Sequence, residues 1–221
     1  MVKNKNVHIV MTGPDLEVKG GISGFARYHL KQDISDRFKI IYHPTTVDGN
    51  KIKKICFYIK SLVIFINRLI LDRKIKIIHI CSSSGGSFYR KAVILIISKV
   101  FGKKVIFHIH GSRFYNKAHS LRRFCIKKAL DISDSILVLS KQYITMLNKI
   151  IKNTNIKMIP NAVDIADFKS ISIEKKDFLP NIVIIGQLGK RKGTYDILET
   201  IPLVIKEIPE AKFYFAGDGD V

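Results

Sequence analysis

The sequence has few acidic residues and few cysteines for its length. Asp and Glu number 18 against 38 Lys and Arg in 221 residues, which gives a formal net charge of +20. The three cysteines, Cys56, Cys81 and Cys125, are odd in number and far apart, which excludes a disulfide scaffold and favours a reducing compartment. Intrinsic disorder is excluded as well, because 47% of the residues are hydrophobic and can bury enough apolar surface to offset the chain entropy.

No acidic residue occurs from Arg73 to Leu130, a stretch that holds 14 basic residues. Residues 1–180 carry 33 basic and 12 acidic side chains, a net charge of +21, whereas residues 181–221 carry 5 and 6, a net charge of −1. A surface of one sign attracts phosphates, nucleic acid or an acidic membrane, although a lysine-rich solubilising surface also accounts for the total charge. The Phe and Tyr residues lie mostly in predicted strands and helices rather than among the charges, so no nucleic-acid partner is expected.

The sequence also lacks the uninterrupted apolar run of ~20 residues that a membrane-spanning helix needs. Its longest apolar region, Ile55 to Leu71, is interrupted by Lys60, Asn67 and Arg68. Two accounts of this predicted helix are open: a largely buried helix beside a sheet, which we favour, or a basic amphipathic helix in a membrane interface. Residues 1–11 show no secretory signal, so we expect a cytoplasmic location with peripheral contact to the inner face of an acidic membrane.

Short β-rich segments alternate with helical patterns along the first 160 residues. Strands that are apolar at nearly every position are typical of a parallel sheet covered on both faces. The fold class is therefore predicted to be α/β, a doubly wound Rossmann-like domain. The predicted strands are Val7 to Met11, Phe38 to Tyr42, Ile75 to Cys81, Val105 to His110, Ser135 to Leu139 and Ile156 to Ile159, and the predicted helices are Ser23 to Asp33, Ile52 to Leu71, Ser87 to Phe101, Ala118 to Leu130 and Lys141 to Lys152.

The alternation stops at residues 165–180, where mixed charges and a final proline indicate a linker. It resumes with a strand, a helix and a strand at Asn181 to Ile185, Thr194 to Ile208 and Ala211 to Ala216. One β-α-β unit leaves sheet edges and apolar surface uncovered. We therefore expect residues 1–164 to form the first domain and residues 181–221 to form the start of an incomplete second Rossmann-like domain.

Three glycines, Gly20, Gly21 and Gly24, follow the first predicted strand in the run KGGISGFARYHL. Glycine permits positive φ and lets backbone N–H groups approach a phosphate at the positive end of a helix dipole. The spacing is not G-x-G-x-x-G, which argues against a nicotinamide-dependent dehydrogenase. A phosphate-binding loop and a flexible turn account for the cluster about equally well.

Two histidines alternate at the end of the fourth predicted strand, in the run IFHIHGSRF. Period two places His108 and His110 on one face, and His110 lies at the carboxyl end, where open α/β sheets bind their ligands. We interpret His108 as a satisfied core histidine and His110 as a functional residue, while Arg113 either binds phosphate or is solvated. No Cys, Asp or Glu lies near them in sequence to complete a metal site, so no metal is expected.

A cluster of cations follows the first strand of the second domain, in the run VIIGQLGKRKGTYDILE. Lys190, Arg191 and Lys192 lie between glycines, just before a predicted helix. Cations beside the N-terminus of a helix can bind a diphosphate. The alternative is that these three side chains are simply exposed to water. The run does not match a Walker A motif.

These three clusters, in this order and spacing, resemble the retaining glycosyltransferases of family 4, whose fold is two facing Rossmann-like domains called GT-B. The matching stretches are GGISGFARYHL, VIFHIHG, SDSILVLS, IPNAVDIADF, and IGQLGKRKG followed by EIPEAKFYFAGDGD. They cover nearly the whole chain.

The resemblance implies roles for the residues of the first domain. Gly20 and Gly21 would contact the sugar nucleotide or the acceptor. His110 would lie beside the transferred sugar, and it is the residue to which we assign a catalytic role.

In the second domain the family's loop reads Gly-Arg-Leu, then three residues, then Lys-Gly, and its Arg and Lys bind the donor diphosphate. Lys192 and Gly193 match this pattern, whereas Gln187 stands where the arginine is expected. Lys190 or Arg191 would then supply part of the missing positive charge.

The family also carries a pair of glutamates, seven residues apart, that hold the donor sugar and ribose beyond the AGDGD strand. This sequence stops before that pair, so we expect a truncated form of an enzyme with a further ~100 to 150 residues. The implied function is retaining, metal-independent transfer of a hexose from a UDP- or GDP-linked sugar to a lipid-linked saccharide or polysaccharide. No cofactor is expected besides this nucleotide-sugar substrate. The alternative is an inactive remnant that binds a membrane or a partner.

Overall fold

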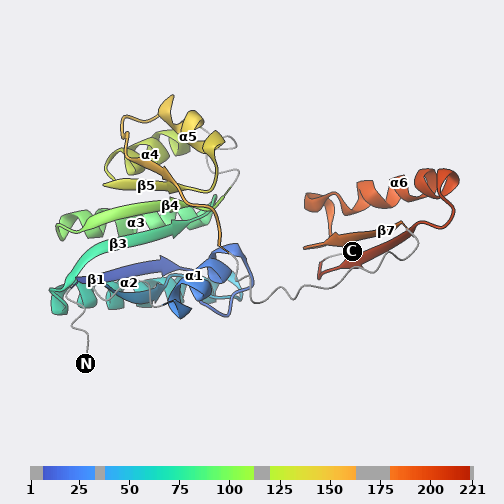
Figure 1. The fold of residues 1–221 in the computed structure, drawn as a ribbon. Helices are drawn as coiled ribbons and strands as arrows, with labels where there is room; N and C mark the ends of the chain where they lie inside the picture. Colours follow the sequence, from blue (N-terminus) through green and yellow to red (C-terminus); the bar gives the residue numbers. More distant parts are fainter. Residues whose placement is uncertain (1–6, 33–37, 112–119, 163–179, 220–221) are drawn as a thin grey trace. The chain divides into compact units, whose positions relative to one another are not determined.

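The computed structural model describes residues 7–32, 38–111, 120–162 and 180–219, and it divides into two compact units (Figure 1). The first unit is Met1–Ile165 and the second is Ala166–Val221. Each is described by itself below. The predicted linker, residues 165–180, lies outside the described residues except for Pro180, and so does Arg113.

A six-stranded parallel sheet forms the centre of the first unit, in the order β2-β1-β3-β4-β5-β6. Because every pairing is parallel, the carboxyl ends of all six strands lie at one edge of the sheet. The strands are β1 (Val7–Gly13), β2 (Phe38–Pro44), β3 (Ile75–Ser82), β4 (Lys104–Ile109), β5 (Ser135–Val138) and β6 (Ile156–Met158).

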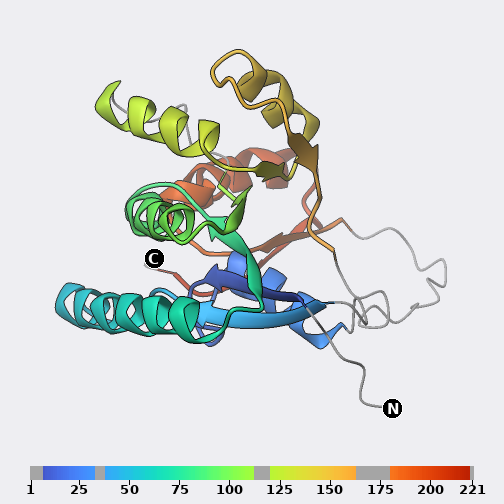
Figure 2. The same cartoon turned by 90° about the vertical axis from the view of Figure 1, so that its left-hand side faces the viewer.

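Helices lie on both faces of this sheet, as predicted for a doubly wound fold (Figures 1 and 2). One face is covered by α1 alone among the described residues, whereas α2, α3, α4 and α5 pack on the other. This distribution follows from right-handed crossovers, because only the connection from β1 to β2 runs toward the β2 edge. The helices are α1 (Gly21–Lys31), α2 (Lys51–Leu71), α3 (Gly86–Val100), α4 (Ser120–Asp131) and α5 (Lys141–Asn148).

The main hydrophobic core lies between the sheet and α2 to α5. Val10 and Phe107 from the strands pack with Phe65 of α2 and Phe88 of α3, and all four are completely buried. The predicted α/β Rossmann-like fold is thereby confirmed for this unit.

The 21-residue helix α2 is not the largely buried helix that we favoured from the sequence. The side chain of Asn50 accepts a hydrogen bond from the Lys53 N–H at 2.9 Å, which caps the helix start. Only one face of α2 is buried, by Ser61, Phe65 and Leu69. The rest of the helix exposes large apolar side chains such as Ile55 and Ile59 among lysines, so its apolar residues are not confined to the buried face. None of the described helices is long and apolar enough to cross a membrane.

The second unit contains two parallel strands, β7 (Asn181–Ile185) and β8 (Lys212–Ala216), and the helix α6 (Thr194–Glu207). A short 3-10 turn, Lys190–Lys192, precedes α6. Several apolar strand residues of this unit, including Val183, Ile185 and Tyr214, are exposed.

Candidate functional site

A pocket of ≈ 300 Å³ lies at the carboxyl edge of the first sheet. Gly20 and Gly21, at the start of α1, line it together with His110, which follows β4. The other polar residues in its lining are Lys19, Ser23, Ser83 and Asn161. The structure thus brings together the three site residues that were predicted in the first domain.

Gly20 and Gly21 line the pocket with backbone atoms alone. Gly20 has extended backbone, and a Cβ atom added at Gly20 or Gly21 would meet no other atom within 4 Å. Contacts within the protein therefore do not require glycine at positions 20 and 21. The first turn of α1 holds no acidic residue, so the positive end of its dipole faces this pocket without a neutralising carboxylate on the helix.

His110 is held at the pocket by its backbone and its ring. Its N–H donates to the carbonyl of Ser82 at 2.8 Å, and its ring centroid lies 4.0 Å from that of His108 and 4.8 Å from that of Phe25. The buried Nε2 has no hydrogen-bond partner among the described residues. Burial, helped by His29, lowers the pKa of His110 to about 4, so the imidazole is neutral at pH 7 and can bind a hydroxyl group.

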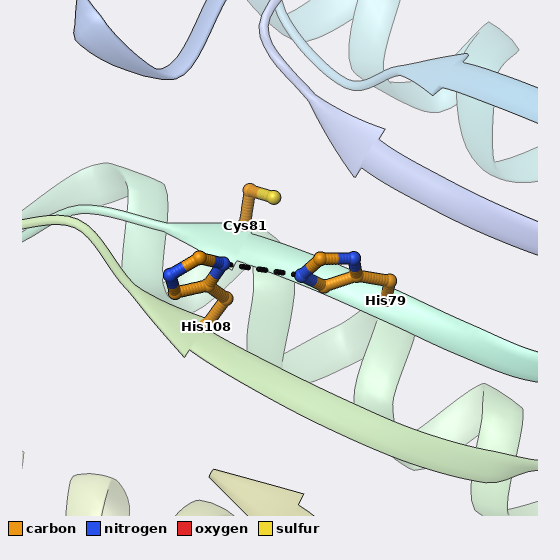
Figure 3. A group of neighbouring side chains, drawn as sticks. All are labelled: His79, Cys81 and His108. Atoms are coloured by element: carbon orange, nitrogen blue, oxygen red, sulfur yellow. Dashed lines mark hydrogen bonds between the residues drawn. The ribbon is translucent and has the colours of Figure 1, made fainter. Parts of the chain in front are cut away.

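His108 is completely buried, as predicted for a core histidine, but it is not fully satisfied. Its Nδ1 lies 3.2 Å from Nε2 of His79 on β3, while its own Nε2 has no partner among the described residues (Figure 3). Burial lowers the pKa of His79 to about 3 and that of His108 to about 2, so both rings are neutral and can share one hydrogen bond.

Cys81 joins these two histidines to form a group that sequence reasoning missed (Figure 3). The potential ligand atoms of His79, Cys81 and His108 lie within 4.8 Å of one another, and two imidazoles with a thiol are a donor set that suits Zn²⁺. The described residues supply three ligands rather than the four of a structural zinc site, and burial raises the pKa of the Cys81 thiol to about 12. The available signal was the alternation of His79 and Cys81 on β3, which places both on one face.

A second pocket of ≈ 410 Å³ lies directly beside the first and shares Pro14, Val18, Ile22 and Ser83 with it. Its lining includes Lys91, which is only 2% exposed. The sequence did not single out this lysine, because its burial depends on packing between α3 and the ends of β1 and β2.

The loop of the second unit presents polar side chains near the start of α6. Gly193 has φ 76°, a left-handed conformation that favours glycine, and it lies between the 3-10 turn and the helix. The Gly189 N–H donates to Oγ1 of Thr194 at 2.7 Å and fixes the loop against the helix start. Lys190, Lys192 and Gln187 are exposed, and the side chain of Arg191 lies outside the described part of the chain.

Comparison with known proteins agrees with these observations. The family model for glycosyltransferase family 4 matches residues 21–167. One subunit of the phosphatidylinositol N-acetylglucosaminyltransferase of Arabidopsis thaliana is 33% identical over 133 residues, which are 57% of this chain and 29% of that protein. The gpi3 subunit of the same transferase in Schizosaccharomyces pombe is 34% identical over 76 residues, 34% of this chain and 16% of that protein. The chain therefore matches less than a third of the length of these curated relatives.

Solved structures show the same fold at low sequence identity. Anabaena HepE in complex with UDP and glucose superposes with a TM-score of 0.61 at 10% identity, over 96% of this chain and 61% of that chain. A HepE structure with UDP-glucose gives a TM-score of 0.55 at 11% identity, over 95% and 69% of the two chains. The match of the family model over more than half of the sequence, together with the Rossmann-like sheet, establishes that this chain belongs to glycosyltransferase family 4.

Proposed function

We propose that this chain is part of a retaining, metal-independent glycosyltransferase that moves a hexose from a nucleotide sugar to a lipid-linked saccharide or polysaccharide. The observation that carries the proposal is the pocket in which Gly20, Gly21 and His110 meet, at the edge of the sheet where open α/β folds bind ligands.

In the proposed reaction the acceptor hydroxyl forms a bond to the anomeric carbon while the bond to the nucleotide diphosphate breaks on the same face. The proton of that hydroxyl leaves with the diphosphate. The protein has to align both substrates and stabilise the developing phosphate charge. Neutral His110 would hold a sugar hydroxyl through Nε2, which has no partner in the described part of the chain. The positive end of α1 would favour the anionic donor.

In the second unit, Lys190 and Lys192 would bind the diphosphate beside the start of α6. Gln187 offers an amide where the family pattern has an arginine, so it can donate a hydrogen bond but supplies no fixed charge. The exposed Lys190 and Lys192 of the same loop would supply part of the positive charge that the arginine provides in the family pattern.

The relatives narrow the substrate classes in this proposal. HepE binds UDP and UDP-glucose, which favours a UDP-linked donor over a GDP-linked one. The curated relatives are named as subunits of a phosphatidylinositol N-acetylglucosaminyltransferase, which favours a lipid acceptor and an association with further subunits.

A basic apolar surface on the first unit supports contact with an acidic membrane. Its apolar part consists of exposed side chains on α2, α3 and α4. These three helices lie on the same face of the sheet, and α3 contacts the other two (Figure 2). The exposed side chains recur at helical spacing, and no acidic residue occurs from Arg73 to Leu130, so the charge near them is positive. We call this the apolar stripe surface, and its residues are Ile52, Ile55, Ile59 and Val63 of α2, Tyr89, Val93, Ile96 and Val100 of α3, and Leu121 and Phe124 of α4.

Sedimentation with vesicles tests the membrane contact. Wild-type chain is expected to bind phosphatidylglycerol vesicles at low salt and less at high salt, because polybasic attraction is screened. The triple substitution of Ile52, Ile55 and Ile59 to Gln is expected to weaken binding without unfolding, since all three are exposed. Leu203→Gln, an exposed position on α6, serves as the matched control.

The transferase proposal is tested with a chain extended through the whole second domain, beside the 221-residue chain. Incubation with UDP-glucose or UDP-N-acetylglucosamine and phosphatidylinositol vesicles is expected to give a glycolipid whose anomeric configuration, read by proton NMR, is that of the donor. Vesicle binding by both chains without sugar transfer or hydrolysis would favour the inactive remnant. Tight oligonucleotide binding with neither activity would refute the whole proposal.

A further inference from the structure

The second pocket contains a buried lysine, Lys91, that has no carboxylate partner among the described residues. Nζ of Lys91 donates to Oγ1 of Thr45 at 2.6 Å and lies 3.3 Å from Oγ1 of Thr12, and both hydroxyl groups belong to buried residues. An ammonium group offers three hydrogen-bond donors, so two neutral hydroxyl groups leave its charge unpaired. Burial of an ammonium group without a counter-charge is unfavourable, so an anion bound beside Lys91 would stabilise its charged form.

Other positive groups converge on the same cavity. Arg90 precedes Lys91 on α3, and its Nε is buried with no hydrogen-bond partner among the described residues. Lys54 from the first turn of α2 also lines the pocket. The acidic side chain in the lining is that of Asp48, which is exposed to solvent, so the pocket is positive at its base.

The backbone around the pocket adds to this preference. The start of α3 contributes Ser84, Gly86 and Ser87 to the lining, and its first turn has no acidic residue. The serine hydroxyls and the positive end of the helix dipole are groups that bind phosphate oxygens. The cavity therefore combines charge, hydroxyl donors and a helix start around one space.

The position of the pocket connects it to the proposed reaction. It abuts the pocket of Gly20, Gly21 and His110, with which it shares lining residues. The pocket also lies at the start of α2, because Lys54 in the first turn of this helix lines it. The apolar stripe surface begins at the same end of α2, with Ile52 and Ile55. A ligand with a phosphate in this cavity would thus have the pocket of Gly20, Gly21 and His110 on one side and the apolar stripe surface of α2 on the other.

We propose that the second pocket is a phosphate-binding subsite, built by Lys91, Arg90 and Lys54, that receives the phosphate group of the acceptor. The identification with the acceptor rests on the proposed function, whereas the binding of a phosphate group does not. Burial lowers the pKa of Lys91 to about 7, with Arg90 lowering it further and Cys81 acting in the opposite direction. A phosphate in hydrogen-bond contact raises that pKa again, so binding at pH 8 takes up a proton.

Calorimetric titration of the 221-residue chain with inorganic phosphate tests the subsite without any turnover. We expect saturable binding in wild-type chain and affinity weakened at least about tenfold in Lys91→Met, because a charge-assisted contact is lost. Lys60→Met on the exposed part of α2 is the matched control and is expected to bind like wild type. Titration at pH 8 in two buffers of different ionisation enthalpy is expected to show uptake of about one proton in wild-type chain and in Lys60→Met, but not in Lys91→Met.

Arg90→Met provides a second variant should Lys91→Met fold poorly, and thermal unfolding verifies that each variant is folded. No binding of phosphate by wild-type chain, equal affinity in Lys91→Met, or an equal loss in Lys60→Met would overturn the subsite.

A further titration separates free phosphate from a lipid headgroup as the source. Glycerophosphoinositol and inorganic phosphate are each titrated into wild-type chain. Tighter binding of glycerophosphoinositol, lost in Lys91→Met, supports an acceptor headgroup. Equal or weaker binding than inorganic phosphate overturns the assignment to the acceptor and leaves a site for free phosphate.

Discussion

Acidification from pH 7 to pH 5 is expected to destabilise the first unit through its buried histidines. His43 is 2% exposed, and its Nε2 lies 2.8 Å from the hydroxyl of Ser61. Burial, with Arg68 and Lys91 nearby, lowers its pKa from 6.5 to about 4. Burial also lowers the pKa values of His79 and His108, to about 3 and about 2, and that of His110 to about 4.

The direction follows from proton binding in the two states. Each folded-state pKa lies below that of the unfolded chain, so between the two values the unfolded state binds more protons. The stability that the neutral rings contribute is present above pH 6.5 and is lost as the pH falls toward 4. From pH 7 to pH 5 each histidine removes about 2 kcal/mol from the free energy of unfolding, and four together remove roughly 7 kcal/mol, which is comparable with the whole stability of a domain.

Urea unfolding followed by circular dichroism at several pH values measures this effect, since the chain has no tryptophan. The variant His43→Gln, in which an amide can replace the contact with Ser61, is expected to lose about 2 kcal/mol less between pH 7 and pH 5 than wild type. Asp134 does not contribute between pH 7 and pH 5. Burial raises the pKa of its carboxyl group, but hydrogen bonds from Lys99 and Val105 outweigh burial and lower it to about 2, so this group titrates below pH 4. A free energy of unfolding that stays constant or rises from pH 7 to pH 5 would refute the reasoning.

Four further predictions concern the proposed reaction and the core. His110→Ala in the extended chain is expected to lower kcat/KM by about 10² to 10⁴ while leaving binding of the donor, measured by calorimetry, within about threefold. Lys192→Ala, at an exposed position, is expected to raise KM for the UDP-sugar about tenfold with an unchanged Tm. Phe65→Ala empties a fully buried position and is expected to lower the free energy of unfolding by about 3–5 kcal/mol, whereas Val63→Ala on the exposed face changes it by less than about 0.5 kcal/mol, both measured with urea. Dialysis against EDTA is expected to leave sugar transfer unchanged.

A different result would contradict each of these four predictions. Unchanged kcat/KM in His110→Ala would remove that residue from the reaction, and an unchanged KM in Lys192→Ala would mean that the loop does not bind the donor. Equal losses in Phe65→Ala and Val63→Ala would contradict the assigned buried face of α2. Activity that EDTA abolishes and Zn²⁺ restores would contradict a metal-independent reaction and make His79, Cys81 and His108 the candidate ligands among the described residues.

The sheet and most helix positions could be predicted because local sequence determines them. The strands are apolar at consecutive positions and the helices show apolar periodicity, so the predicted elements agree with the structure apart from their ends. The meeting of Gly20 and His110 was also predictable, since both follow the carboxyl ends of strands and those ends share one edge. Topology alone brings such residues together, without any knowledge of side-chain packing.

The buried polar groups could not be predicted, because they depend on contacts between elements far apart in sequence. The pairing of His79 with His108 requires the register of β3 against β4, in which Cys81 pairs with His108. The burial of Lys91 requires α3 to pack against the ends of β1 and β2. In the sequence each of these residues looks like an ordinary member of a strand or a helix.

The packed face of α2 determines which of its residues are exposed. Because an α-helix turns about 100° per residue, residues three or four apart share a face. The face that holds Phe65 and Leu69 packs on the core. With that face buried, Ile52 and Ile55 are exposed and Lys54 lines the second pocket. The packing of one helix face therefore connects the stability of the first unit, the proposed phosphate subsite and the proposed membrane contact.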